Sequence, residues 1–485
     1  MGANATIGLV VAAYMAALLL LGWLAARLTR SPEDFFLAGR SLGAWVTAIS
    51  STAASESGWV VLGAVGMAYS GGVSALWFAP GCLVGYLVNL YLVAPALRRE
   101  SAQSGALTLP DYLAFRYPSH ARSLRVAAVA VILLSLAGYV AAQMTATGKA
   151  MEAILGLPYR TGILLGGLVI VLYTFSGGFR AVSWTDFFQG LIMVCALVGM
   201  PLLALAAVGG YGPLLAKLAE VDSTLVSVTG GKSGKALVSF LVGMLGIGLG
   251  YPGQPHVLTR YMAAASHEKI RQSQIIAMVW GVLVFYGAGF LGLAGRLLMP
   301  QLATAGDPEQ LFPLLAKSML PPLVAGVMLA AILSAIMSTV SSQLLVAASA
   351  TSRDLVEQVL GATRSGKASV LAGRLSVLAL GLAAVLVAVG EVRVVFWFVL
   401  FAWSGLGAAF GPVVLASLFS KKLTGGGALA GIITGFAVTV LWKVTGLSDS
   451  VMYELPPAFA LAALAAWLVS AWQSRRSSTT RPVGG

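Results

Sequence analysis

The chain has few charged residues for its length. Lys, Arg, Asp and Glu make up 10% of its 485 residues, whereas hydrophobic residues make up 58% and the mean hydropathy is +0.90. Soluble domains carry about 25% charged residues, so this composition excludes a soluble globular protein. Nucleic acid is also excluded as a partner despite a sequence pI near 9.9, because the basic residues lie in short loops between apolar runs. The composition indicates an integral membrane protein in contact with the lipid bilayer.

Cysteine and histidine are equally scarce. Cys82 and Cys195 are the only cysteines, and both lie within apolar runs, which excludes a disulfide framework. The three histidines, His120, His256 and His267, are scattered without the spacing of a metal site. No nucleophile stands beside a recognisable base. We therefore do not expect an enzyme.

Apolar runs of bilayer length dominate the rest of the chain. They predict an all-α integral membrane protein with about thirteen transmembrane helices, and no gap between them is long enough to fold as a soluble domain. Residues 1–485 thus form a single transmembrane domain that ends in a polar tail, 474–485. The spans are expected near residues 7–27, 43–69, 74–97, 123–150, 160–178, 184–208, 236–255, 273–297, 318–350, 371–390, 393–418, 424–444 and 451–473.

The distribution of Lys and Arg predicts the orientation, because cytoplasmic loops are enriched in both. If the loop after the first span is cytoplasmic, most of the Lys and Arg residues fall on that side. An odd number of spans then puts the N-terminus outside and the tail in the cytoplasm. The first span lacks a basic segment before it and is followed by Arg27 and Arg30, so we interpret it as a retained helix. The expected location is the cell inner (plasma) membrane, as a multi-pass protein.

Two of the predicted spans, 43–69 and 236–255, contain small and polar residues at their middles. The first reads ISSTAASESGW over 49–59, and the second reads GIGLGYPGQP over 246–255. A helix interrupted at membrane depth frees backbone groups that lipid cannot satisfy, so such breaks lie inside the protein or line a cavity. Paired breaks at corresponding places in two halves indicate the central binding site of a transporter.

Two acidic residues, Glu56 and Asp186, fall within or at the edge of predicted spans. An acid in hydrocarbon costs about 2.5–3.5 kcal/mol on insertion scales, so it usually faces a partner or a cavity. Both are candidate site residues. Alternatively, Glu56 is a protonated carboxyl that satisfies the broken backbone, and Asp186 is an interfacial residue at the end of its span.

The ninth span carries a row of small polar residues. Ala335, Ser338, Thr339 and Ser342 lie at i, i+3, i+4 and i+7, so they share one face of a helix, and Ser341 lies beside them. Hydroxyl and carbonyl oxygens are hard ligands that suit a small monovalent cation. The alternative is that these hydroxyls bond to the preceding turn or pack between helices.

Six motifs occur in one order along the chain. They are FFLAGRSLG at 35–43, SGW at 57–59, LTLPDY at 107–112, GGFRAVSWTD at 177–186, GQPH at 253–256 and MST at 337–339. In sequence and spacing they resemble the sodium/solute symporter family, and within it the bacterial sodium/proline symporters.

The resemblance implies a LeuT-like fold, in which two inverted repeats of five helices each contain one broken helix. Residues 43–208 would form repeat 1 and residues 236–418 repeat 2. The span 7–27 would be an extra N-terminal helix, and 424–473 two C-terminal helices.

The resemblance also implies ion ligands. The main Na⁺ site would consist of the Ala53 and Glu56 carbonyls with Ala335, Ser338 and Thr339. A possible second Na⁺ site, found in some members of the family, would consist of Asp186, Ser338, Ser341 and Ser342.

The implied solute site contains aromatic and proline residues together with several departures from the family pattern. Ser55 replaces an Asp, with the acid moved one place to Glu56; Ile247 replaces a Trp; and Gln143 replaces a small residue. A lost indole and an added amide predict a solute larger or more polar than proline. The predicted solute contacts are Ser55, Glu56, Trp59, Tyr139, Gln143, Ile247, Tyr251 and Pro255.

Together these features predict a sodium-coupled secondary active symporter that imports a small organic solute by alternating access. Proline or a related amino acid is the expected solute, and a larger amino acid or a carboxylate is the alternative. A channel or a sensor on the same fold is a further alternative. A channel requires rings of polar groups along a pore, and a sensor requires a signalling domain after Trp472; the sequence has neither.

Overall fold

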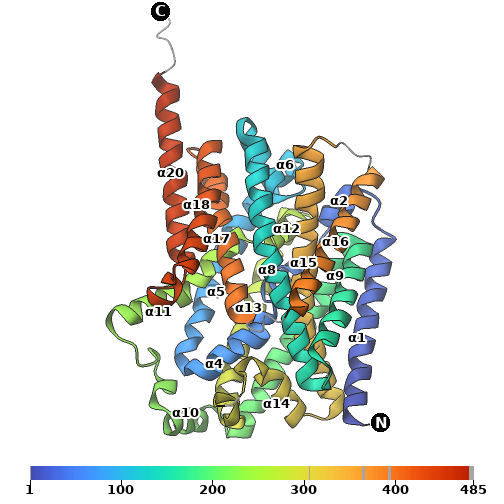
Figure 1. Ribbon diagram of the computed structural model, residues 1–485, viewed down its shortest axis with the longest axis vertical. Helices are drawn as coiled ribbons and strands as arrows, with labels where there is room; N and C mark the ends of the chain where they lie inside the picture. Colours follow the sequence, from blue (N-terminus) through green and yellow to red (C-terminus); the bar gives the residue numbers. More distant parts are fainter. Residues whose placement is uncertain (1, 305, 363–365, 391–394, 480–485) are drawn as a thin grey trace, which may run out of the picture.

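The computed structural model describes residues 2–304, 306–362, 366–390 and 395–479. Within these ranges the chain is helical, and one isolated bridge between Leu42 and Ala264 is its only β-type pairing. The long helices run side by side in one bundle (Figure 1). Residues 393–394 of the span predicted at 393–418, and residues 480–485 of the predicted tail, lie outside the described residues.

The bundle is built from fifteen α-helical segments. They are α1 (Ala3–Ala26), α3 (Ala44–Ser55), α4 (Val65–Gly71), α5 (Phe78–Leu87), α6 (Ala94–Ser104), α8 (Ala121–Leu155), α9 (Tyr159–Val208), α11 (Gly234–Gly246), α12 (Pro255–Met262), α13 (His267–Leu298), α15 (Pro322–Ser349), α16 (Gly366–Val389), α17 (Val395–Phe419), α18 (Gly425–Val444) and α20 (Leu455–Thr479).

Shorter helices connect or extend these segments. They are α2 (Pro32–Leu37), α7 (Leu109–Arg116), α10 (Tyr211–Val221), α14 (Leu311–Met319) and α19 (Leu447–Ser450); the π-helices η2 (Trp59–Ala64), η4 (Val88–Val93) and η10 (Ala350–Val359); and the 3₁₀-helices η1 (Ala38–Arg40), η3 (Gly72–Trp77), η5 (Pro118–His120), η6 (Ser223–Val226), η7 (Ile247–Gly253), η8 (Pro300–Ala303) and η9 (Pro308–Gln310).

Eleven helical stretches of the described residues are long and apolar enough to cross a membrane. Two of them, Trp59–Ser104 and Tyr159–Val208, contain 46 and 50 residues and each includes parts of two predicted spans. At 1.5 Å per residue, 50 residues extend about 75 Å, which exceeds the roughly 30 Å of a hydrocarbon core. Each stretch is interrupted by a glycine with positive φ, Gly72 or Gly178. The count of thirteen spans stays a prediction.

The connection expected between the spans 160–178 and 184–208 differs from the prediction. Instead of a loop over 179–183, helical geometry continues on both sides of Gly178, which alone departs from it with φ 57° and ψ −145°. Only glycine adopts this conformation without strain. A Cβ at this position would also lie 2.5 Å from the ring of Phe35, which leaves no room for a larger residue.

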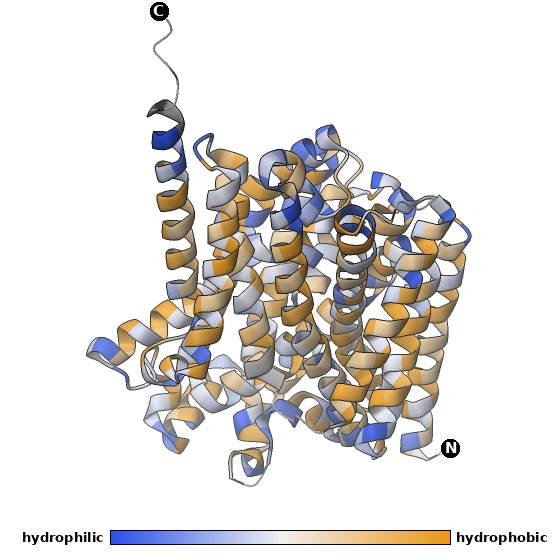
Figure 2. Cartoon of the chain, turned by 45° about the horizontal axis from the view of Figure 1, so that its top comes forward, coloured by the Kyte–Doolittle hydropathy of each residue, from blue (hydrophilic) through white to orange (hydrophobic). Residues whose placement is uncertain are grey.

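The bundle has a buried centre and a lipid-compatible exterior. In the most apolar stretches of α15 and α17, 78% and 83% of the residues are buried, whereas in those of α1 and α20 only 22% and 28% are buried. Large apolar side chains such as Leu134, Leu168 and Leu386 are exposed on the sides of the bundle. Hydrophilic residues concentrate toward its two ends (Figure 2). An exposed apolar belt of this extent indicates a surface in contact with lipid.

Connections on opposite sides of the predicted spans separate cleanly in space. The helices α2 and α6 lie near one end of the bundle, and α10 and α14 lie near the other (Figure 1). The helix α1 begins at the end that carries α10 and α14, whereas α20 finishes at the opposite end (Figure 1). The start of α1 and the end of α20 therefore lie on opposite sides of the bundle.

Both predicted helix breaks are confirmed. The first helix ends at Ser55, Glu56 leaves helical geometry with φ −99° and ψ 64°, and a π-helix resumes at Trp59. In the second, α11 passes into the 3₁₀-helix η7, and Gln254, with φ −90° and ψ 104°, separates η7 from α12. The breaks lie within the bundle, where Gly248 approaches α5 so closely that a Cβ would lie 2.0 Å from the Gly81 carbonyl oxygen.

This close approach generates a test of the packing at the second break. We expect Gly248→Ala to lower thermal stability and folded yield sharply, because the added methyl group meets rigid backbone. Gly138→Ala in α8 is the matched control, since a Cβ there has nothing within 4 Å. Thermal unfolding in detergent measures both. Equal melting temperatures for the two variants would contradict the packing.

Candidate functional site

Side chains of α8 and of the break itself hydrogen-bond to the backbone at the first break. Gly58 N–H donates to Gln143 Oε1 at 2.8 Å. Ser57 Oγ accepts from the Trp59 N–H at 3.1 Å and from Gln143 Nε2 at 3.2 Å, and the Tyr139 hydroxyl donates to it at 3.4 Å. Gln143, predicted as a solute contact, thus hydrogen-bonds to the break itself.

Oxygen atoms converge between the first break and α15. Ser338 Oγ donates to the Ala53 carbonyl at 3.0 Å, and Thr339 Oγ1 lies 3.0 Å from the Ala54 carbonyl and 3.5 Å from that of Ala53. Both hydroxyls also lie within 3.3 Å of the Ala335 carbonyl. All five residues are buried. Neutral hydroxyl and carbonyl oxygens from two elements are the hard donor set that suits a monovalent cation.

Four of the five residues predicted for the main ion site therefore lie together. Ala53, Ala335, Ser338 and Thr339 share these contacts, and sequence reasoning missed the carbonyl of Ala54. The remaining predicted ligand, Glu56, lies at the end of the same broken segment. Its side chain points elsewhere, into the cavity described below.

The acid predicted for a second ion site is paired with an arginine. Asp186 Oδ2 accepts from Arg260 Nη2 at 2.9 Å and from Ser50 Oγ at 2.7 Å. The guanidinium also donates to Ser342 Oγ, to the His256 carbonyl and to Ser50 Oγ. Asp186 and Arg260 are fully buried. The Arg260 guanidinium thus contacts two of the four residues predicted for the second ion site, Asp186 and Ser342.

Ser341 lies apart from that ion pair. Its hydroxyl donates to the Ser338 carbonyl at 3.1 Å, within α15. Asp186 is fully buried within the bundle, so its carboxylate is enclosed by protein. The span predicted at 236–255 leaves Arg260 in the cytoplasmic loop that would follow it, and this placement is wrong, because α12 continues to Met262 and carries Arg260 into the core. Hydropathy ended that span at Pro255 because the next turns contain His256 and Arg260.

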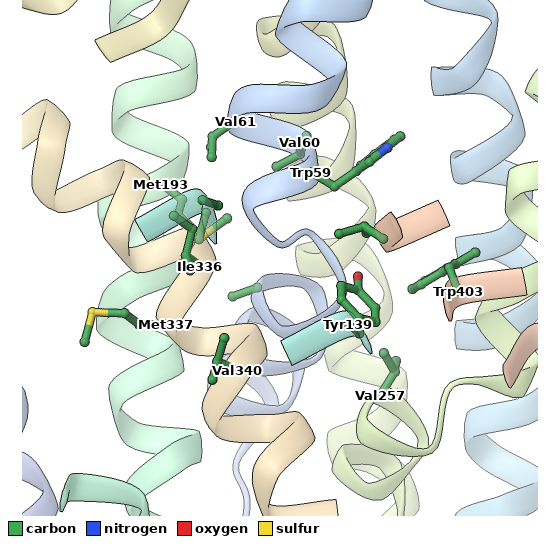
Figure 3. Packing of buried hydrophobic residues seen from close by; sticks show 14 of the residues in the cluster. Trp59, Val60, Val61, Tyr139, Met193, Val257, Ile336, Met337, Val340 and Trp403 are labelled. Atoms are coloured by element: carbon green, nitrogen blue, oxygen red, sulfur yellow. The ribbon is translucent and has the colours of Figure 1, made fainter. Parts of the chain in front are cut away.

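A small cavity of about 10 Å³ lies beside the first break, with room for about one water molecule. In the close-up, Trp59, Tyr139 and Trp403 lie on one side of the broken segment, and Ile336 and Met337 of α15 lie on the other (Figure 3). Six of the eight predicted solute residues line this cavity. The complete lining is Ser55, Glu56, Trp59, Tyr139, Ile247, Tyr251, Val399, Leu400 and Trp403.

The two other predicted solute residues lie outside this lining. Gln143 hydrogen-bonds to Gly58 of the first break, and Pro255 lines a separate cavity together with Phe36 and Asp354. Sequence reasoning missed Trp403, which donates from Nε1 to the Ile247 carbonyl at 3.1 Å and packs edge-on against Tyr251 at 4.9 Å between ring centroids. Nothing in the local sequence signalled it, because Trp403 reaches the second break from α17, about 150 residues further along the chain.

Ion pairs link the connecting segments to the bundle toward both of its ends. Arg125 Nη1 contacts Asp111 Oδ1 at 2.5 Å and Asp354 Oδ1 at 2.7 Å, which joins α7, α8 and η10. Toward the opposite end, Lys149 Nζ contacts Asp307 Oδ2 at 2.7 Å and Glu309 Oε2 at 2.6 Å. These clusters hold the connecting segments against the bundle above and below the cavity.

Comparison with known proteins identifies a family. A family model described as "Sodium:solute symporter family" matches residues 35–435. The high-affinity proline transporter PutP of Bacillus subtilis is 40% identical over 93% of this chain and 95% of its own length. The sodium/proline symporter of Escherichia coli is also 40% identical, over 92% and 89%.

Solved structures support the same fold. A sodium-coupled sialic acid symporter in a substrate-bound, outward-open state is similar with a TM-score of 0.81 at 21% identity, covering 96% of this chain and 98% of its own. Mhp1, a nucleobase-cation-symport-1 family transporter, is similar with a TM-score of 0.58 at 15% identity, over 94% and 97%. The predicted fold class is thereby confirmed.

The contacts of Gln143 predict a structural effect. Gln143→Met removes the acceptor of the Gly58 N–H and leaves a buried donor unsatisfied, so we expect a loss of about 1–3 kcal/mol in the free energy of unfolding. Gln343→Met is the matched control, because Gln343 is equally buried in α15 and neither of its polar side-chain atoms has a partner among the described residues. Thermal unfolding compares the two. A larger loss for Gln343→Met would contradict the assignment.

Proposed function

Because the chain belongs to the sodium:solute symporter family, and is thus a sodium-coupled symporter rather than an enzyme, we propose that its solute is proline or a related small amino acid. Two relatives at 40% identity over nearly the whole chain are proline transporters. The cavity beside the first break has room for about one water molecule in this conformation, so its support for a small solute comes from its lining and not from its volume. Its aromatic lining suits an apolar ring.

Sodium is proposed to bind between the first break and α15. Its ligands would be the Ala53 and Glu56 carbonyls with Ala335, Ser338 and Thr339. The observation that carries this proposal is the direct contact of the Ser338 and Thr339 hydroxyls with the Ala53 and Ala54 carbonyls. A cation there would hold the hinge of α3 against α15 and so connect ion binding to the shape of the adjacent cavity.

Sodium entry also supplies the driving force. Each positive charge that moves inward across a membrane potential gains about 2.3 kcal/mol per 100 mV. One ion at about 100 mV can therefore support roughly 50-fold accumulation of a neutral solute, before the sodium gradient itself is counted.

Alternating access is proposed to proceed by rocking around this fixed site. The repeats would be 43–208 and 236–418, with 7–27 and 424–473 outside them, in one domain over 1–485. The end with α2, α6 and the Arg125 cluster would face the cytoplasm, because its loops collect most of the Lys and Arg residues. The N-terminus would then lie outside and the tail 474–485 inside. The Arg125 and Lys149 clusters are suited to serve as inner and outer closures.

For the second ion site, we propose that Arg260 supplies the positive charge beside Asp186. Two cations within hydrogen-bond range of one carboxylate repel each other strongly in a buried site. Sodium at Asp186, Ser338, Ser341 and Ser342 therefore requires Arg260 to leave. One sodium ion per solute is the stoichiometry that follows while the ion pair stays in place.

The ion site predicts the effect of losing one hydroxyl ligand. We expect Ser338→Ala or Thr339→Ala to raise the sodium concentration for half-maximal uptake about tenfold, since a hydrogen-bond-strength contact contributes on the order of 1–1.5 kcal/mol. Ser349→Ala is the matched control, because among the described residues its buried hydroxyl bonds only to the Val346 carbonyl of its own helix. Uptake of labelled proline against sodium concentration measures the effect. Unchanged half-saturation in both site variants would remove the assignment.

The buried ion pair predicts strong coupling between its members. Asp186→Asn and Arg260→Gln should each destabilise the protein by about 3–5 kcal/mol, because each leaves a buried charge without its partner. The double variant should lose much less stability than the sum of the two single losses.

The ion pair also predicts the transport stoichiometry. The charge moved per solute, from current and flux measured on the same membranes, should be one in the parent. A ratio of two, lowered by Asp186→Asn, would instead favour a second sodium ion.

A further inference from the structure

The side chain of Glu56 points into the cavity although its backbone belongs to the break. Tyr251 and Tyr86 donate their hydroxyls to the same oxygen, Oε1, at 2.7 and 3.0 Å, and Ser55 Oγ lies 3.1 Å from it. No hydrogen bond from another described residue reaches Oε2. The residue is 1% exposed and lines the cavity, and Oε2 is not fully enclosed by protein, so this oxygen faces the cavity without a donor from the described residues.

Glu56 is also the only charged residue in the described lining of the cavity. The rest of the lining is aromatic, aliphatic or hydroxyl-bearing. The two tyrosines fix one carboxyl oxygen and so orient the other. A carboxylate oxygen in a nearly enclosed cavity is costly without a donor, and an occupant that brings a donor with a positive charge relieves that cost.

Aromatic rings surround the same space. Tyr251 packs edge-on against both Tyr86 and Trp403, with ring centroids 4.9 Å apart in each pair. Trp59 and Tyr139 complete the aromatic part of the lining. Ring faces attract cations, and an aromatic enclosure with one acid is the arrangement that recognises substituted ammonium groups.

From this geometry we propose that Glu56 binds the protonated nitrogen of the solute through Oε2. The solutes of this site are small amines enclosed by the aromatic rings, and their charge is matched by a side-chain carboxylate. The proposal rests on the proposed function and narrows its substrate class. The positive nitrogen is the required group, so an amino acid whose carboxylate is amidated remains a ligand, and an acid without the amine does not.

The competing explanation gives Glu56 only a structural role. In that case its carboxyl ties the end of α3 to Tyr86 of α5 and Tyr251 of η7. The solute amine would then be held by carbonyls freed at the helix breaks. Glu56→Gln separates the two explanations, because the amide keeps the size of the side chain and an acceptor oxygen for both tyrosines but loses the charge.

The experiment measures ligand-induced thermal stabilisation of the purified full chain in saturating sodium. The probes are proline, prolinamide and tetrahydrofuran-2-carboxylate, in which oxygen replaces the ring nitrogen; alanine, alaninamide and lactate form a second set. For the parent we expect binding of the amine and the amide but not of the oxygen analogue. Glu56→Gln should weaken amine binding roughly ten- to hundredfold, the value of a charge-assisted hydrogen bond. Glu56→Asp should recover part of the preference.

A Glu56→Gln variant that prefers amines over the oxygen analogues as strongly as the parent does would overturn the proposal. So would a parent that binds tetrahydrofuran-2-carboxylate or lactate as well as the amines. Stabilisation by sodium alone reports the fold of each variant independently of the solute. If the parent binds no probe of either set in sodium, the proposed amino-acid function fails together with this inference. If the parent binds proline and Glu56→Gln binds it equally well, the proposed function holds and only the inference about Glu56 fails.

Discussion

Satisfying the backbone at two broken helices is the constraint on which the structure depends. A hydrocarbon environment offers no donor or acceptor, so each freed amide and carbonyl needs a partner within the protein. Gln143 and Ser57 supply partners at the first break, and α15 meets its carbonyls through Ser338 and Thr339. At the second break, Gln254 Nε2 donates to the Gly250 and Trp403 carbonyls. The same polar groups that make the breaks tolerable provide the oxygens of the proposed ion site.

Buried charge follows the same logic. Asp186 and Arg260 neutralise each other within the core, and the Arg125 and Lys149 clusters do so toward the two ends of the bundle. Glu56 is the exception among these acids, because hydroxyls rather than a cation face it. The central cavity therefore contains one acidic side chain without a cationic partner, next to the neutral carbonyl and hydroxyl oxygens between the first break and α15. This difference in charge distinguishes the proposed solute position from the proposed ion position, although both adjoin one short segment of α3.

Much of this arrangement could be predicted from the sequence, for identifiable reasons. Small and polar residues inside apolar runs revealed both breaks, and helical spacing grouped Ser338 with Thr339. The contacts that could not be predicted join residues that lie far apart in the sequence. Arg260 was misplaced because a hydropathy pattern assigns charged residues to loops. Its partner Asp186 lies 74 positions earlier, so no local pattern indicates the ion pair. Gln143 was assigned to the solute because its type was known but not the direction of its side chain. Trp403 and Tyr86 had no local signal at all.

The central claim is that a cation between Ala53 and α15 rigidifies the first break. Backbone hydrogen exchange around residues 53–58 and 335–342, in sodium and in an equal concentration of choline, tests it most directly. The account predicts slower exchange in sodium for both segments, with little change in α18 and α20, which lie away from the site. Equal exchange in the two salts at both segments would contradict it.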